Sequence, residues 1–279
     1  MGKATPLWRS ACRQVRGLEF APPAVCPPSS TKFATKFATK FAAKFAAKFA
    51  AMTPAMNTEI ARFNMIEQQI RPWQVLDSSV LSLLATVRRE DFVPAHHRAM
   101  AFMDTQVPLL EGDAAGPCML EPKVEARLLQ ALQVQRHESV LEVGTGSGFM
   151  AALLAHRALK VKTLECRAAL AQIARANLAR NGVVNATVID VPAAEGAQGR
   201  AADGPFDVIL LSGSVAEVPR GLLEQLKPGG RLAAVVGQLP IMRARLYTRV
   251  SETDWSQTDL FDTVAPRLDG FAEPAQFRF

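Results

Sequence analysis

A glycine-rich stretch near the middle of the chain reads Leu141-Glu142-Val143-Gly144-Thr145-Gly146-Ser147-Gly148. Residues 139–143, three of which are apolar, are typical of a short buried strand, and residues 149–157 are typical of a helix. Glycine suits the turn between two such elements, because it adopts positive φ and lets the backbone pass close to a ligand. A dinucleotide fingerprint starting at Gly144 would need glycine at position 149, where phenylalanine stands. The spacing therefore favours a nucleoside ligand without a pyrophosphate.

Strands and helices alternate after this turn. The expected strands are residues 139–143, 161–165, 186–189, 206–212, 231–236, 243–250 and 260–264. The expected helices are residues 149–157, 168–180 and 219–226, the last of them stopped by Lys227-Pro228-Gly229-Gly230. This alternation predicts an α/β fold with a doubly wound, Rossmann-like, mostly parallel sheet. In such a sheet the ligand crevice lies at the carboxyl ends of the strands.

Apolar spacing predicts three helices before the sheet. An irregular segment follows Pro94 and continues through Pro117, between the second helix and the third. Residues 57–70 form the first, which Arg71-Pro72 ends. Asp77 or Ser78 caps the second, and the third runs from residue 122 to residue 132. The apolar face of the first helix comprises Ile60, Phe63, Ile66 and Ile70.

Polar residues stand at two expected strand ends. Glu165 ends the second strand, where a carboxylate can accept hydrogen bonds from both ribose hydroxyls; the alternative is a surface glutamate. Ser212 and Ser214 end the fourth strand at the mouth of the crevice. They either line an acceptor pocket or cap the following helix.

Charge divides the chain into two parts. The chain has 32 basic and 26 acidic residues. Residues 1–51 hold nine of the basic residues and one of the acidic ones, so residues 52–279 hold 23 basic and 25 acidic residues. The main part is mildly acidic, which argues against a nucleic-acid partner. Within it, residues 52–137 are expected to supply helices and a substrate-side loop, and residues 138–279 the cofactor-binding sheet.

The first 51 residues contain a Lys-Phe-Ala tetrad that repeats five times between Lys32 and Ala51. We interpret this part as a low-complexity or disordered tail, added by a start codon placed far upstream. A basic amphipathic surface helix and a targeting segment are the alternatives.

The remaining composition excludes several classes of protein. No apolar run is long enough to span a membrane. The four cysteines form no Cys-x-x-Cys pair, and no metal-ligand spacing with histidine is visible, so no metal site is expected. Unpaired cysteines favour a reducing, cytoplasmic compartment. The sequence defines no oligomeric state.

The stretch from Leu141 to Gly148 resembles motif I of S-adenosylmethionine-dependent methyltransferases. Over residues 57–270 the chain is similar to the protein-L-isoaspartate O-methyltransferase family. The supporting segments are Arg89-Glu90-Asp91-Phe92-Val93-Pro94, Ala101-Phe102-Met103-Asp104, Pro205-Phe206-Asp207-Val208-Ile209 and residues 222–232. The resemblance implies S-adenosylmethionine as cofactor and methyl-ester formation on abnormal aspartyl carboxylates of peptides or proteins.

The resemblance also implies roles for residues of the turn. The cofactor site would comprise Glu142, Gly144, Thr145, Gly146, Ser147, Gly148 and Glu165. The glycine turn would face the methionine part and the ribose, and Glu165 would bind the ribose.

The chain departs from the family pattern at two places. The family usually has Thr-Ile-Ser-Gln-Pro where this chain has Cys118-Met119-Leu120-Glu121-Pro122, so Leu120 replaces a hydroxyl of the substrate site and Glu121 adds a negative charge. Leucine cannot donate a hydrogen bond, and a carboxylate repels an anionic acceptor.

The second departure follows the third strand. The family usually has a Gly-Asp pair there, whose acid helps to bind the adenine, and Pro192 takes the place of that acid here. Asp190 and Glu195 remain as substitutes.

Methyl transfer to a carboxylate needs no general base, because the acceptor is already ionised at pH 7. No catalytic residue is therefore assigned, and the lack of a Ser-His-Asp or Cys-His set is expected. Three functions stay open: an isoaspartyl-type carboxyl methyltransferase, a methyltransferase of the same scaffold with a different acceptor, and a non-catalytic cofactor-binding module.

Overall fold

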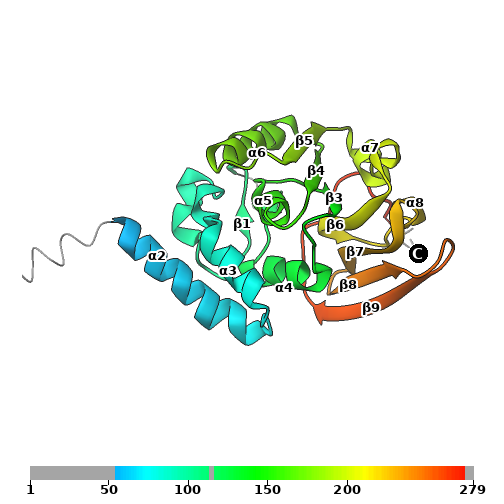
Figure 1. Ribbon diagram of the computed structural model, residues 1–279. Coiled ribbons are helices and arrows are strands. Elements are labelled where there is room, and N and C mark those ends of the chain that lie inside the picture. The colour runs from blue at the N-terminus through cyan, green and yellow to red at the C-terminus, as the bar shows by residue number, and fades with distance from the viewer. Residues whose placement is uncertain (1–53, 113–115, 274–279) are drawn as a thin grey trace, which may run out of the picture. The chain divides into compact units, whose positions relative to one another are not determined.

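A computed structural model describes residues 54–112 and 116–273 of the chain. A seven-stranded sheet forms its centre, in the spatial order β5-β4-β3-β6-β7-β8-β9 (Figure 1). The strands are β3 (Ser139–Val143), β4 (Lys160–Glu165), β5 (Ala186–Asp190), β6 (Phe206–Val215), β7 (Leu226–Gln238), β8 (Ile241–Arg249) and β9 (Trp255–Asp262). The pairs among β3 to β7 are parallel, whereas β8 is antiparallel to both β7 and β9. The predicted mostly parallel α/β sheet is confirmed.

Helices cover both faces of the sheet, because its central strands are apolar on both sides. The helices are α4 (Pro122–Leu132), α5 (Phe149–Ala155), α6 (Ala168–Arg180), α7 (Ala193–Gln198) and α8 (Arg220–Leu223). On one face Val140 and Val208 pack in a core with α4, α5 and α6. On the other, Leu141 and Ile209 pack in a second core with α7 and α8. This two-sided burial holds the carboxyl ends of the strands in fixed positions.

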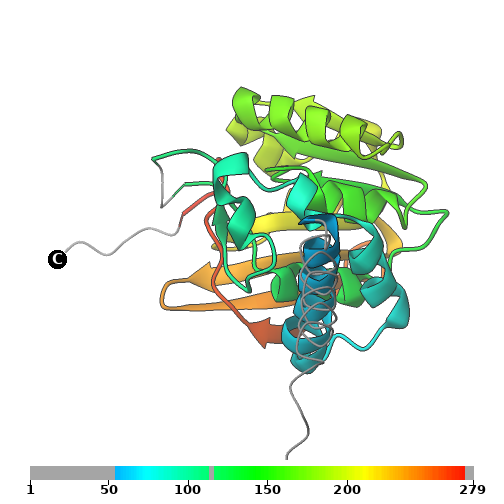
Figure 2. The same cartoon turned by 90° about the vertical axis from the view of Figure 1, so that its left-hand side faces the viewer.

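The N-terminal helices pack outside α4 (Figures 1 and 2). Helix α2 (Pro54–Asn64) continues through a π-helical turn, Met65–Ile70, and a 3-10 turn, Arg71–Trp73. Ile66 and Ile70 are buried as predicted, but Ile60 and Phe63 are 47% and 62% exposed. The predicted apolar face is therefore wrong in its first half. The turn Met65–Ile70 is π-helical and therefore has more than 3.6 residues per turn. An apolar spacing of 3.6 residues thus does not continue from α2 into this turn.

Helix α3 (Ser78–Thr86) begins where the sequence predicted, since the Asp77 carboxylate accepts the Ser79 backbone N–H at 2.8 Å. Short 3-10 turns follow at Arg89–Asp91 and Ala95–Met100, and another lies at Ala201–Asp203. The segment predicted to be irregular contains a two-stranded sheet of β1 (Val107–Pro108) and β2 (Cys118–Met119).

Three predicted elements differ in the structure. Helix α8 is shorter than expected, and the residues predicted to follow it as a stop belong to β7. The pairing of β6 with β7 jumps from Phe206–Leu226 to Val208–Arg231, so residues 227–230 form a bulge, which tolerates proline. Strand β9 begins at Trp255, earlier than predicted, and α7 was not predicted.

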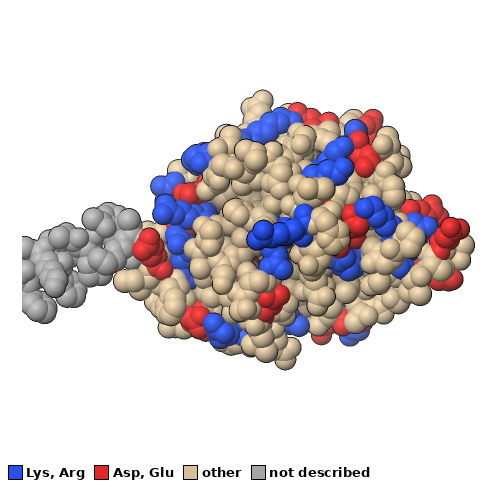
Figure 3. Space-filling model, viewed as in Figure 1, with Lys and Arg blue, Asp and Glu red and all other residues tan. Residues whose placement is uncertain are grey.

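Basic and acidic side chains are interspersed on the face shown in Figure 3. No helix within residues 54–112 and 116–273 is long and apolar enough to cross a membrane. The predictions for residues 1–51 lie outside the described residues.

Candidate cofactor and acceptor site

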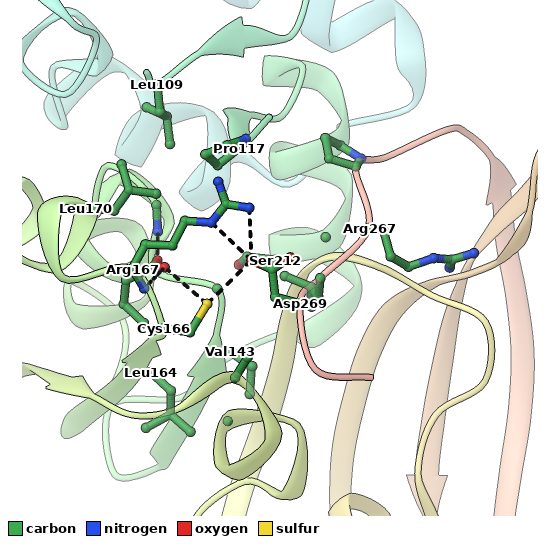
Figure 4. A pocket seen from close by; sticks show the side chains of 18 of the residues that line it. Leu109, Pro117, Val143, Leu164, Cys166, Arg167, Leu170, Ser212, Arg267 and Asp269 are labelled. Atoms are coloured by element: carbon green, nitrogen blue, oxygen red, sulfur yellow. Dashed lines mark hydrogen bonds and ion pairs between the residues drawn. The ribbon is translucent and has the colours of Figure 1, made fainter. Parts of the chain in front are cut away.

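A pocket of about 280 Å³ lies at the carboxyl ends of β3, β4 and β6 (Figure 4). Its walls come from the glycine turn after β3, from residues 165–167 after β4, and from Ser212 and Gly213 on β6. Residues 116–118 and 266–269 complete it. The crevice therefore lies where the strand order predicted it.

The glycine turn shapes one wall through its backbone. Gly144 and Gly146 line the pocket with φ of 93° and 55°, which side chains rarely adopt. A Cβ on Gly146 would lie 3.1 Å from Leu109 Cδ1. Gly148 instead packs against α6, where a Cβ would lie 3.3 Å from Ala174. Two of the three glycines, Gly144 and Gly146, thus line the pocket, while their close approach to a ligand stays a prediction.

Thr145 and Ser147 have buried side chains that do not line the main pocket. They line a smaller cavity of about 30 Å³ next to it. The Thr145 and Thr163 hydroxyls lie 2.6 Å apart, and the Ser147 carbonyl accepts a hydrogen bond from Asn177. Both residues hold the turn in shape.

Glu165 stands at the end of β4 with its carboxylate on the pocket wall. One oxygen accepts the Gly146 N–H at 2.8 Å, and the other accepts the Arg167 N–H at 3.1 Å. Burial raises the pKa of Glu165, while these backbone donors lower it. A partly buried acceptor at this strand end has the chemistry that ribose hydroxyls require.

Glu142 is fully buried beneath the turn. Its carboxylate accepts hydrogen bonds from the Ser212 hydroxyl at 2.6 Å and from the Thr163 hydroxyl at 2.7 Å. Burial raises its pKa to about 7, against the effect of these two donors. Since Ser212 lines the pocket, Glu142 fixes the direction of the Ser212 lone pairs and acts through that residue.

The two acids considered for the adenine do not line the pocket, although their neighbours in the sequence do. The Asp190 carboxylate pairs with Arg175 at 3.0 Å, and both side chains are about half exposed. Glu195 is exposed on α7. Val191, Ala193 and Gly196 form the pocket wall in this region. An apolar wall suits the faces of an adenine ring; neither acid lines the pocket, and an acid contact to the adenine stays a prediction.

The substrate-side loop divides into side chains near the pocket and side chains turned from it. Cys118 lines the main pocket and the small cavity, whereas Leu120 is 4% exposed and lines the small cavity only. Met119 is equally buried. Glu121 lines neither space, and one of its oxygens accepts from Gln106 Nε2 at 3.3 Å. The charge expected to oppose an anionic acceptor is thus directed toward Gln106.

Residues 265–271, called the strap below, were not predicted to reach the site. The strap runs beside the end of β6, where the Ser214 N–H donates to the Pro266 carbonyl at 2.7 Å and the Ser214 carbonyl accepts from Leu268 at 2.9 Å. The Ser214 hydroxyl also donates to Ala265 at 2.8 Å. Ser214 is fully buried and therefore anchors the strap instead of lining the pocket.

Both thiols on the pocket wall are poor nucleophiles. Burial, reinforced by nearby carboxylates, raises the pKa of Cys118 to about 12 and that of Cys166 to about 11. Within residues 54–112 and 116–273, no three His, Cys, Asp or Glu side chains are grouped to hold a metal ion. The site's chemistry thus consists of shape, hydrogen-bond acceptors and apolar walls.

Comparison with known proteins identifies the family. The model of the protein-L-isoaspartate(D-aspartate) O-methyltransferase family matches residues 61–264. The chain belongs to this family. A protein-L-isoaspartate O-methyltransferase of Koribacter versatilis is 38% identical over 201 residues, covering 72% of this chain and 87% of that protein. One of Rhodopseudomonas palustris is 38% identical over 215 residues, covering 75% and 95%.

A solved structure described as a protein-L-isoaspartate O-methyltransferase from Plasmodium falciparum, in complex with S-adenosyl-L-homocysteine, has the same fold. Its TM-score is 0.63 at 19% identity, over 75% of this chain and 98% of that one. As a member of the family, the chain is an S-adenosylmethionine-dependent O-methyltransferase. The glycine turn and Glu165 fit that cofactor, because they offer close backbone approach and a ribose acceptor in one pocket.

Proposed function

We propose that this methyltransferase esterifies isoaspartyl carboxylates of peptides and proteins. The observation that carries the proposal is the pocket bounded by the glycine turn and Glu165, with the Cys118 loop as its acceptor-side wall. Relatives that are 34–41% identical bear the name of this activity. A cytoplasmic location accompanies the proposal, supported by the unpaired Cys118 and Cys166.

The bound cofactor supplies an electrophilic methyl group on a sulfonium. Glu165, held by the Gly146 N–H, would offer its remaining lone pairs to the ribose hydroxyls, and Ser212, oriented by Glu142, would offer a fixed acceptor. The acceptor carboxylate is ionised at neutral pH, so the protein need only place it in line and exclude water. The side chains of Leu109, Leu164 and Leu170 form apolar parts of the pocket wall, which help to exclude water.

A second candidate is a methyltransferase with another acceptor. Leu120 supports it, because its buried side chain lines the cavity beside the turn with methyl groups, where the family pattern has a hydroxyl. The site would then favour an acceptor that needs no donor at this position.

Transfer of labelled methyl groups distinguishes the two candidates. We expect an isoaspartyl peptide to be labelled and the matched aspartyl peptide to remain unlabelled. The label should be lost on mild alkaline treatment, as for a methyl ester. Labelling of a cell extract without labelling of the isoaspartyl peptide would favour the second candidate. No labelling of either would refute both.

A further inference from the structure

A second hollow, of about 530 Å³, adjoins the cofactor pocket and is called the groove below. The two spaces share four lining residues, which are Gly116, Cys118, Pro266 and Arg267. One wall of the groove comes from Gln106 and Pro108, and another from the hairpin between β7 and β8. The groove is thus continuous with the place where an acceptor group must enter.

Arg267 is the one cation, among the described residues, that lines both the pocket and the groove. Its Nη1 donates to the Gly237 carbonyl at 3.0 Å, which fixes the guanidinium against the hairpin. Figure 4 shows its side chain directed away from the labelled residues of the cofactor pocket. The guanidinium is therefore directed toward the groove and the hairpin.

A carboxylate already binds this guanidinium. Glu273, which lines the groove, places Oε1 2.7 Å from Arg267 Nε. The Glu273 side chain is 54% exposed and that of Arg267 is 28% exposed. Such partly exposed ion pairs contribute little to stability, so another carboxylate can replace this one at small cost. The guanidinium retains further N–H donors for a planar bidentate contact.

We propose that the groove holds the acceptor peptide and that Arg267 binds an acidic side chain flanking the methylated residue. The proposal rests on the proposed isoaspartyl activity and adds a sequence preference to it. Glu273, which pairs with Arg267, occupies the position of that acidic side chain and competes with it. Arg267 is then a specificity-determining residue that does not touch the methyl group.

Matched isoaspartyl peptides test the preference. They carry Glu or Gln at one position, either just before or just after the isoaspartyl residue. For wild type we expect kcat/KM to be about threefold to fivefold higher for the Glu peptide than for the Gln peptide, as for a partly exposed charge pair. The gain should come from a lower KM, with kcat unchanged. Arg267→Met should abolish the preference and Arg267→Lys should keep part of it. Glu273→Gln should increase the preference, because it removes the internal competitor.

Arg243→Met is the matched control. It removes an arginine of β8 that pairs with Asp259 and Asp262 and does not line the groove, so the preference should persist. Binding of the same peptides, labelled and titrated in the presence of S-adenosylhomocysteine, gives a readout that does not need turnover. Equal kcat/KM and equal affinity for Glu and Gln peptides would overturn the role of Arg267 while leaving the isoaspartyl activity intact. Preferential binding without methylation of any peptide would instead refute the proposed activity.

Discussion

Asp269 on the strap accepts one hydrogen bond from Arg167 Nε, at 3.0 Å from Oδ2, and forms an ion pair with Arg167 Nη2 at 2.9 Å from the same oxygen. Both residues line the cofactor pocket, and Figure 4 shows the pair linking the strap to the segment after β4. The pair therefore joins two walls that lie about a hundred residues apart in the sequence.

Asp269→Asn should weaken this link and raise the Kd of S-adenosylhomocysteine by about twofold to fivefold, the range for a partly exposed ion pair. Isothermal titration measures the effect, and added salt should narrow the difference from wild type. Asp262→Asn, on β9, is the control and should leave the Kd unchanged. A Kd equal to wild type in Asp269→Asn would show that the strap stays in place without the pair.

Gly146→Val should abolish detectable cofactor binding. The residue has φ of 55°, and even a Cβ would approach Leu109 to 3.1 Å in the pocket wall. Gly182→Val is the matched control, because Gly182 also has positive φ, at 68°, but a Cβ there meets nothing within 4 Å. Both variants carry the backbone strain of a branched residue at positive φ. Loss of binding in both would mean that strain, not the pocket, is responsible.

The free energy of unfolding should decrease as the pH rises from about 4.5 to about 7, because of Glu142. Burial raises the pKa of its carboxyl to about 7 in the folded chain, from an ordinary value of 4.5. A raised pKa means that the folded state binds the extra proton, so the stabilisation is complete below the unfolded pKa and is lost as pH rises through 7. The full effect is on the order of 3 kcal/mol.

Thermal melting of wild type and Glu142→Gln across this pH range measures that contribution. The glutamine keeps a polar group beside Ser212 and Thr163 but cannot titrate, so its melting temperature should depend less steeply on pH. Parallel pH profiles for the two proteins would be incompatible with a raised Glu142 pKa.

Leu120→Ser should increase kcat/KM for an isoaspartyl peptide several-fold, by restoring a donor at the cavity beside the glycine turn. A hydrogen bond to a charged group contributes about 1.5–3 kcal/mol, although an imperfect distance would reduce the gain. The change should also lower the free energy of unfolding by about 2–3 kcal/mol, since Leu120 is 4% exposed. Assays therefore belong well below the melting temperature.

Glu121→Gln is the companion variant, and it should have little effect on turnover. Its carboxylate accepts from Gln106 and lines neither the pocket nor the small cavity. If kcat/KM increased strongly in Glu121→Gln and did not change in Leu120→Ser, Glu121 and not Leu120 would be the residue that limits isoaspartyl turnover.

A variant that begins at Met52 should melt within a few degrees of the full chain and bind S-adenosylhomocysteine with the same Kd. The described residues, 54–112 and 116–273, supply the seven-stranded sheet, two apolar cores and the lining of the pocket. Differential scanning calorimetry and titration provide the measurement. A drop of ten degrees or more would show that residues 1–51 pack on the remainder.

The fold and the glycine turn were predictable because their signals are local. The buried strand before Gly144 and the carboxylate of Glu165 follow from neighbouring residues. The strap was not predictable, since its place depends on two backbone hydrogen bonds with Ser214, about fifty positions away: the Ser214 N–H donates to the Pro266 carbonyl, and the Leu268 N–H donates to the Ser214 carbonyl.

The positions of Asp190 and of Phe63 were not predictable either, because they too depend on contacts or geometry beyond the local sequence. Asp190 is drawn to Arg175 on α6, a contact that arises only in three dimensions. Phe63 is exposed because the helix widens after it, which apolar spacing alone does not reveal. Local sequence patterns thus indicate which helices and strands form. The contacts of the side chains that lie between these elements depend on how the elements pack in three dimensions.

The arrangement of Ser214 and the strap also bears on biosynthesis. The ribosome completes β3, β4 and β6 well before it reaches Asp269, so a nascent chain has an open crevice whose last wall does not yet exist. A ligand stabilises only the state that it binds. The complete cofactor pocket therefore forms only after the strap has been synthesised, and any stabilisation that depends on the whole pocket comes late in synthesis.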